Sequence, residues 1–111
     1  MKKQQWKVWL TGIDAGREDI IRALETAGCE VTLGRLFTDT WHYTEEELME
    51  KVQGMDAIMI STGDGNITRR VMEAGRKLKV IAKRAIGVND IDVSAATDLG
   101  ILVTNLSLIH I

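Results

Sequence analysis

The stretch that decides the fold runs from Lys79 to Asn105 and reads KVIAKRAIGVNDIDVSAATDLGILVTN. It opens with a short apolar run and then turns through Ile86-Gly87-Val88. Asp92 is a residue type that caps helix starts, and Gly100 stands where a helix would end, just before a second apolar run. The stretch therefore predicts a strand, a loop, a short helix of small residues and a second strand.

Similar units precede this stretch along the chain. Apolar runs of strand length begin near residues 6, 30, 56, 79 and 101, and helical segments lie between them. Each interval holds one strand and one helical crossover, which is the connection that parallel strands require. The sequence therefore predicts an α/β fold, a flavodoxin-like doubly wound parallel five-stranded sheet with strand order 2-1-3-4-5.

The helical segments have recognisable faces and ends. In residues 17–27 the predicted apolar face consists of Ile20, Ala23, Leu24 and Ala27. Thr44, with Glu47 three positions later, has the pattern of a capping box and predicts a helix start. A further helix is predicted over residues 67–78 with Gly75 inside it. An interior glycine costs about 1 kcal/mol relative to alanine, so Gly75 indicates close packing against the sheet.

Composition excludes several classes of protein. The chain has 111 residues, enough for one domain, and its net charge of −2 comes without any basic block, so nucleic-acid binding is not expected. No apolar run approaches the about 20 residues of a membrane span, and the first residues lack the apolar core of a signal peptide. We expect a cytoplasmic protein without a membrane partner. Cys29 is the single cysteine, which leaves disulfide and metal chemistry without support.

Three loops follow strands whose carboxyl ends share one edge of the predicted sheet, and ligands bind at that edge. They are residues 12–16, 61–66 and 84–90. The middle loop is the most polar and glycine-rich, and free backbone N–H groups at a helix start can hold a carboxylate or phosphate. The alternative is an ordinary turn with an Asn or Thr cap. For Gly87 in the third loop, the alternative is a turn that needs glycine for its φ angle.

The middle loop is an incomplete match to a dinucleotide-binding fingerprint. Gly63-Asp64-Gly65 supplies two glycines, but Thr68 occupies the third position. The next strand ends in Lys83-Arg84 instead of the acidic residue that would bind a ribose. We therefore do not expect this loop to bind a nucleotide.

The stretch from Lys79 to Asn105 resembles the substrate-binding domain of the D-isomer-specific 2-hydroxyacid dehydrogenases. Those NAD(P)-dependent enzymes typically carry Gly-Val-Gly-x-Asp-Asn-Ile-Asp followed by Ala-Ala and Gly-Ile-x-Val-x-Asn. This chain departs from the pattern at Ala85, where glycine is usual, and at Asn89-Asp90, where the order is usually reversed. Weaker similarity reaches back to about Lys7.

The resemblance implies a site and a cofactor. Backbone N–H groups of the loop that holds Thr62 and Gly63 would bind the substrate carboxylate, and Ile86 and Gly87 would lie against the substrate and the nicotinamide of NAD or NADP. His42 and His110 do not match the catalytic histidine of the family, so no catalytic residue is assigned and both are interpreted as structural or exposed. Ile60 stands where phosphoglycerate-specific relatives often have arginine, which makes a phosphorylated substrate less favoured.

The resemblance also implies a missing part. The Rossmann domain of the family and its catalytic Arg, Glu and His are not found in this sequence. We therefore interpret residues 1–105 as the truncated substrate-binding domain of a parent enzyme that interconverts a D-2-hydroxy acid and a 2-keto acid and forms a homodimer. Residues 106–111 depart from the family pattern, and our hypothesis is that this tail is not native. The isolated chain is expected to be inactive, marginally stable and prone to associate.

Two other functions are compatible with the same fold. A flavin- or nucleotide-binding flavodoxin-like module would use Thr11-Gly12 and the loop to Gly16. A signalling receiver domain would need an aspartate where Ser61 stands and a lysine where Asn105 stands. Asp14 alone does not supply that site, so the receiver domain is the less favoured alternative.

Overall fold

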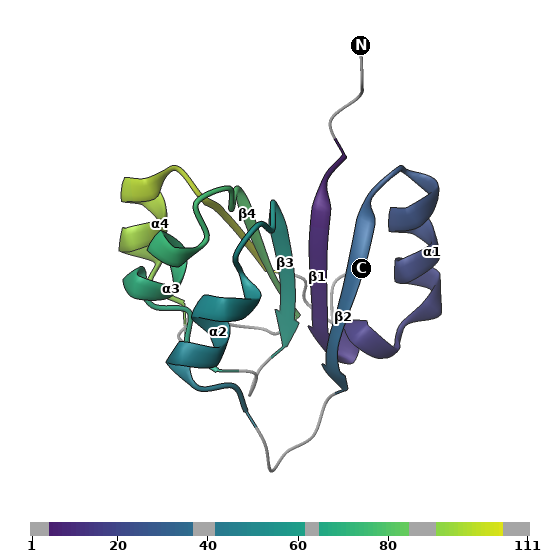
Figure 1. The fold of residues 1–111 in the computed structure, drawn as a ribbon, viewed down its shortest axis with the longest axis horizontal. Coiled ribbons are helices and arrows are strands. Elements are labelled where there is room, and N and C mark those ends of the chain that lie inside the picture. The colour runs from purple at the N-terminus through teal and green to yellow at the C-terminus, as the bar shows by residue number, and fades with distance from the viewer. Residues whose placement is uncertain (1–4, 37–41, 62–64, 85–90, 106–111) are drawn as a thin grey trace.

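Five strands form one sheet in the computed structural model, which describes residues 5–36, 42–61, 65–84 and 91–105. The strands are β1 (Lys7–Gly12), β2 (Glu30–Leu36), β3 (Ala57–Ser61), β4 (Val80–Arg84) and β5 (Leu102–Asn105). Their order is β2-β1-β3-β4-β5, and every neighbouring pair is parallel (Figure 1). The predicted α/β fold and its strand order are confirmed.

Helices cover the two faces of the sheet unequally. The elements between the strands are η1 (Ile13–Gly16), α1 (Glu18–Thr26), α2 (Glu45–Lys51), α3 (Arg69–Ala74) and α4 (Val93–Leu99). Helix α1 lies on one face, and α2, α3 and α4 lie on the other (Figure 1). The chain steps from β1 to β2 in one direction and from β3 to β5 in the opposite direction, and right-handed crossovers then place the helices on opposite faces. None of the helices in the described ranges combines the length and the apolar character needed to cross a membrane.

The predicted helix ends are confirmed where a cap was identified. At the start of α2, the Thr44 hydroxyl accepts a hydrogen bond from the Glu47 amide at 3.2 Å, and the Thr44 amide donates to Glu47 Oε1 at 2.9 Å. At the start of α4, Asp92 Oδ1 accepts from the Ala95 amide at 3.0 Å. Gly100 follows α4 with a φ of 73°, the left-handed conformation that glycine adopts readily.

The prediction for α3 was wrong in length. The helix spans Arg69–Ala74 instead of residues 67–78, because Thr68 caps its start and Gly75 leaves the helical conformation with φ −91° and ψ 76°. Gly75 is therefore at the helix end and not inside it. Gly75 is closely packed, but its neighbour is the end of α2 instead of the sheet, since a Cβ atom on Gly75 would lie 3.2 Å from the Val52 side chain.

The apolar face predicted for α1 was also partly wrong. Ala23 and Ala27 are exposed, while Ile20, Ile21 and Leu24 are half-buried, and no residue of the helix is fully buried. A nine-residue helix has room for one short apolar stripe, and in α1 this stripe consists of Ile20, Ile21 and Leu24, at positions i, i+1 and i+4. Helix α1 is thus the more loosely packed cover of the sheet.

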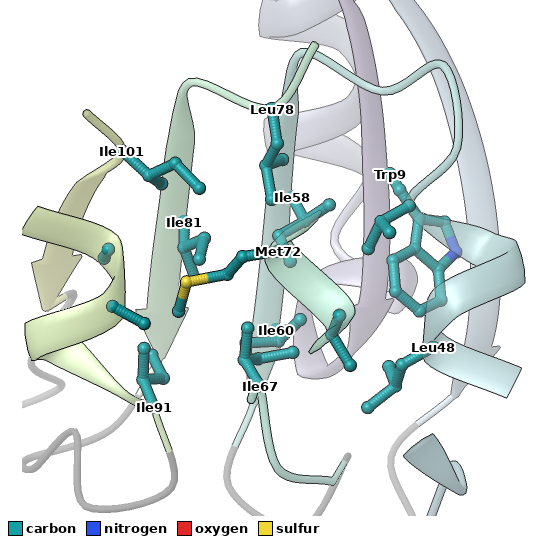
Figure 2. Close-up of a cluster of buried hydrophobic side chains, with 14 of the residues drawn as sticks. Trp9, Leu48, Ile58, Ile60, Ile67, Met72, Leu78, Ile81, Ile91 and Ile101 are labelled. Carbon is teal, nitrogen blue, oxygen red and sulfur yellow. The ribbon is translucent and has the colours of Figure 1, made fainter. Parts of the chain in front are cut away.

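The main core lies between the sheet and the three helices α2, α3 and α4. Figure 2 shows Ile58 and Ile81 from the strands beside Met72 from α3, and all three side chains have an exposed fraction of 2% or less. Full burial of such a side chain contributes about 1.5–3 kcal/mol. This layer therefore stabilises the fold more than the α1 layer does.

Asp56 connects two segments at the amino-terminal edge of the sheet, and its exposed fraction is 3%. Its Oδ2 accepts a hydrogen bond from the Lys7 amide at 2.9 Å, and its Oδ1 accepts from Lys79 Nζ at 3.3 Å. Burial alone would raise the pKa of Asp56, but the Lys7 amide and the Lys79 ammonium outweigh it and hold the pKa below its ordinary value of 3.8. One ionised carboxylate thereby links the start of β1 to the segment that precedes β4.

Candidate functional site

Two loops leave the carboxyl edge of the sheet side by side and return side by side. Ser61 and Arg84, the last residues of β3 and β4, are partners in the parallel register. At the far ends of the loops, Ile67 and Ile91 form a parallel bridge, and the Asp92 amide donates to the Ile67 carbonyl oxygen at 3.0 Å. The two loops therefore begin next to each other and end next to each other.

The four predicted substrate contacts fall inside these two loops. Thr62, Gly63, Ile86 and Gly87 lie outside the described residues. The structure describes residues on either side of each pair, and it brings Ser61 next to Arg84 and Ile67 next to Ile91.

The return of the β3 loop is held by Tyr43. Gly65 has a φ of 132°, and a Cβ atom there would lie 2.7 Å from the Tyr43 carbonyl oxygen. The Tyr43 ring packs edge-on against Trp9 with centroids 5.2 Å apart, and its hydroxyl accepts hydrogen bonds from the Arg35 amide at 2.8 Å and the Thr11 hydroxyl at 3.2 Å. Gly65 thus rests on a residue that is fixed in the core.

The first turn of α3 is held by Glu45 of α2. The Thr68 hydroxyl donates to Glu45 Oε2 at 2.6 Å, and Arg70 Nη1 lies 2.9 Å from Glu45 Oε1. Thr68 Oγ1 also accepts from the Val71 amide at 3.4 Å and so caps α3. The exit of the β3 loop is therefore tied to α2 as well as to the core.

An open hollow of about 530 Å³ lies beside this exit. Its lining residues come from two segments distant in sequence: His42, Tyr43, Thr44, Glu45, Gly65, Asn66 and Thr68. Sequence reasoning selected the second segment as part of a polar loop but missed the first. Thr44 and Glu47 predicted a helix start, and no local pattern shows that this start faces residues 65–68.

Two polar side chains are buried where β3 and β4 end, Ser61 and Lys83. Lys83 has an exposed fraction of 3% and is the register partner of Ile60, and both Ser61 and Lys83 interact with other groups of the protein. Sequence reasoning did not select Lys83, because a lysine at the end of an apolar run is usually exposed. The burial places a basic residue close to the origin of both loops.

The described residues contain no group of three His, Cys, Asp or Glu side chains that could hold a metal ion. His42 is exposed, and His110 lies outside the described ranges.

A parallel sheet with two neighbouring, glycine-containing loops at its carboxyl edge defines an α/β domain of the kind that binds a small ligand at that edge. The sequence model of one family, described as "D-isomer specific 2-hydroxyacid dehydrogenase, catalytic domain", matches residues 11–109. The chain belongs to this family, as its motif between residues 79 and 105 predicted.

Individual relatives support the same family. The D-3-phosphoglycerate dehydrogenase of Methanocaldococcus jannaschii is 42% identical over 93 residues, which are 83% of this chain and 16% of that protein. The hydroxypyruvate reductase of Thermotoga maritima is 36% identical over 64 residues, 58% of this chain and 21% of that protein. The structure of an NAD+-bound 3-phosphoglycerate dehydrogenase from Entamoeba histolytica shares the fold, with a TM-score of 0.72, 23% identity, and coverage of 92% of this chain and 33% of that chain. The chain therefore spans a third or less of each of these proteins.

Proposed function

We propose that this chain is the substrate-binding part of an NAD(P)-dependent oxidoreductase that interconverts a D-2-hydroxy acid and a 2-keto acid. The observation that carries the proposal is the pairing of the two loops, at Ser61 with Arg84 and at Ile67 with Ile91. Family membership and the named activities of the relatives support the reaction type. The small share of each relative that the chain covers supports a parent with further domains, which we propose to be cytoplasmic and homodimeric.

Within this proposal, the two loops have different tasks. Backbone N–H groups at Thr62 and Gly63 hold the substrate carboxylate, since a glycine-rich loop entering a helix can present free amides to an anion. Ile86 supplies an apolar wall, and Gly87 lets the backbone approach the substrate and the nicotinamide. The parallel bridge between Ile67 and Ile91 supports a shared site, because it holds the residues that follow the two loops together.

The nicotinamide cofactor supplies hydride transfer when it is bound, and this chain is not proposed to hold most of it. A dinucleotide fingerprint needs a third glycine for close packing of helix on strand. Thr68 occupies that position, caps α3 and donates to Glu45, so the turn is built for a helix cap. The residues of this turn therefore do not fit a dinucleotide, and we assign NAD or NADP to the remainder of the parent protein. Residues 1–105 are proposed as the substrate-binding domain, with 106–111 as a tail.

A ligand pair that differs only in charge tests the proposal. The purified 111-residue chain is titrated with D-lactate and with D-lactamide while backbone amide signals are followed by NMR. We expect lactate to shift amide signals of both loops, at residues 61–66 and 84–91, and lactamide to shift neither. The signal of Asp56 at the opposite edge should stay fixed with both ligands.

Two results would contradict the proposal. One is a well-dispersed spectrum in which lactate moves neither loop. The other is measurable dehydrogenase turnover by the purified chain with NAD(H) or NADP(H), because we expect this part alone to be inactive.

The flavin-binding alternative is not favoured. It would use Thr11-Gly12 and the loop to Gly16, but the Thr11 hydroxyl is already engaged in the core, where its oxygen lies 3.2 Å from both the Tyr43 hydroxyl and the Arg35 carbonyl oxygen. A bound flavin would colour the protein, so an absorbance spectrum after incubation with flavin separates the two functions.

A further inference from the structure

Among the described residues, helix α1 is joined to the other elements by apolar contacts alone. Its inward residues are Ile20, Ile21 and Leu24, which are half-buried, and no residue of the helix is fully buried. None of its side chains forms a hydrogen bond or an ion pair with another element in the described ranges, and Asp19 is bound by Arg17 just before the helix. Separation of α1 from the sheet therefore leaves no buried polar group without its partner.

The three helices on the other face of the sheet are attached in more ways (Figure 1). Each of them begins with a side chain that caps its first amides, and each contains at least one fully buried residue. The Glu45 carboxylate links α2 to α3 through Thr68, and an ion pair of 2.7 Å between Arg69 and Asp98 links α3 to α4. Helix α1, in contrast, starts at Arg17, whose side chain makes no cap. The layer of α2, α3 and α4 is thus one connected unit.

The connection from α1 to β2 allows the helix to move without the strands. The amides of Ala27, Gly28 and Cys29 donate to carbonyl oxygens of α1 itself. Strand β2 then begins at Glu30, whose amide donates to the Trp6 carbonyl oxygen at 2.8 Å, and it continues in parallel register with β1. The pairing of β1 with β2 therefore does not depend on α1.

The strand face beneath α1 is apolar. Register partners in a parallel sheet lie on the same face, which places Val8 with Val31 and Leu10 with Leu33 on the side opposite Trp9. Val8 and Leu10 have exposed fractions of 3% and 0%. Isolated helices shorter than about 12 residues are not stable in water, so α1, with nine, unfolds when it leaves this face.

We propose that α1 is a detachable cover, which opens and unfolds as a unit while the sheet and the helices α2, α3 and α4 stay folded. The closed form is the resting state, and the open form exposes the apolar face of β1 and β2. Opening leaves the contacts of Tyr43 with Gly65 and Trp9 in place, because none of them involves α1. The proposal does not depend on the proposed function.

Amide hydrogen exchange of the 111-residue chain, followed by NMR, tests the proposal. The protection factor is the exchange rate of an unstructured chain divided by the measured rate. We expect the amides of residues 22–26 in α1 to have protection factors at least about tenfold lower than those of β3. Their exchange should also depend less on urea concentration, because the opening of one helix exposes less surface than global unfolding.

Two variants separate local opening from global unfolding. Ile58→Val lies in the core on the other face and should lower the protection of β3 about fivefold, the effect of about 1 kcal/mol, while α1 keeps its protection. The reason is that Ile58 is equally packed whether α1 is closed or open. Ala23→Gly, at an exposed position of α1, weakens the helix itself and should lower the protection of both α1 and β3 about fivefold.

Three results would refute the proposal. If α1 and β3 have equal protection factors that fall together in Ile58→Val, α1 opens only with the whole domain. If the α1 amides exchange at the rate of an unstructured chain, the closed form is not the resting state. If Ala23→Gly lowers the protection of β3 but not that of α1, exchange within α1 does not require the helix to open.

Discussion

Replacement of Gly65 by alanine tests whether the exit of the β3 loop is fixed by its contact with Tyr43. The φ of Gly65 is 132°, and the new Cβ would lie 2.7 Å from the Tyr43 carbonyl oxygen and 3.1 Å from Leu48 Cδ1. Backbone strain of this kind costs about 1–3 kcal/mol, and forcing an extra methyl group into a packed site costs about 1–3 kcal/mol more. The carbonyl oxygen belongs to the backbone and cannot rotate away. We expect Gly65→Ala to lower the free energy of unfolding by about 3 kcal/mol or more.

Two other glycines isolate the contribution of the contact. Gly28 and Gly54 also have positive φ angles, 95° and 78°, but a Cβ atom on either would meet nothing within 4 Å. Their alanine variants carry the backbone strain alone, so we expect each to lose about 1–2 kcal/mol. Urea unfolding of the three variants, followed by circular dichroism at one pH, measures the difference.

The reasoning is refuted if Gly65→Ala loses no more stability than Gly28→Ala within about 0.5 kcal/mol, the scatter expected of ordinary surface substitutions. A binding measurement provides an independent check. Displacement of the loop exit should weaken D-lactate binding in Gly65→Ala and leave it unchanged in Gly28→Ala and Gly54→Ala. Equal affinity in all three variants would show that the loop does not depend on Gly65.

Substitutions at three further positions have expected outcomes. Asp56→Asn should lose about 1–3 kcal/mol at neutral pH, because the carboxylate that binds the Lys79 ammonium is removed. The pKa of Asp56 is lowered in the folded protein, so its carboxylate stabilises the fold above the ordinary value of 3.8. This stabilisation is lost as the pH falls through the folded pKa. In urea unfolding at acidic pH, the free energy of unfolding should therefore fall less steeply with pH in Asp56→Asn than in the unmodified protein. Glu45→Ala should lose about 1 kcal/mol and Glu45→Gln less, because glutamine can still accept from Thr68; equal losses in urea unfolding would contradict that role. Thr44→Ala should lose about 1 kcal/mol in the same assay, and Thr44→Ser should retain the cap.

The sequence predicted the fold well because its signals are local. Strand spacing gave the order of the sheet, and the caps at Thr44, Asp92 and Gly100 each depend on residues within one helical turn. The prediction for α3 failed where two local signals competed. Val71, Met72 and Leu78 continue a helical period, but Thr68 and Gly75 set the actual ends of the helix. Cap and breaker residues prevailed over periodicity.

The candidate site was predictable only in part, for a related reason. The glycine-rich loops could be identified because each lies between a strand and a helix in sequence. The hollow could not, because residues 42–45 and 65–68 meet only after the sheet and its helices are packed. Lys83 was missed for the same cause: its burial depends on neighbouring strands and not on its own segment.

The two edges of the sheet have different roles: contacts at the amino edge stabilise the fold, and the carboxyl edge is proposed to bind the ligand. At the amino edge, Asp56 joins the start of β1 to the segment before β4 through its carboxylate, and its carbonyl oxygen accepts from the Lys79 amide at 2.8 Å. At the carboxyl edge, the strands are followed by loops whose sequences contain glycines and polar residues, and ligands of parallel sheets bind at this edge. Gly65 connects the two roles, because it touches Tyr43 and Tyr43 packs on Trp9 in the core. A change at Asp56 should therefore lower stability without affecting ligand binding, and a change at Gly65 should lower both.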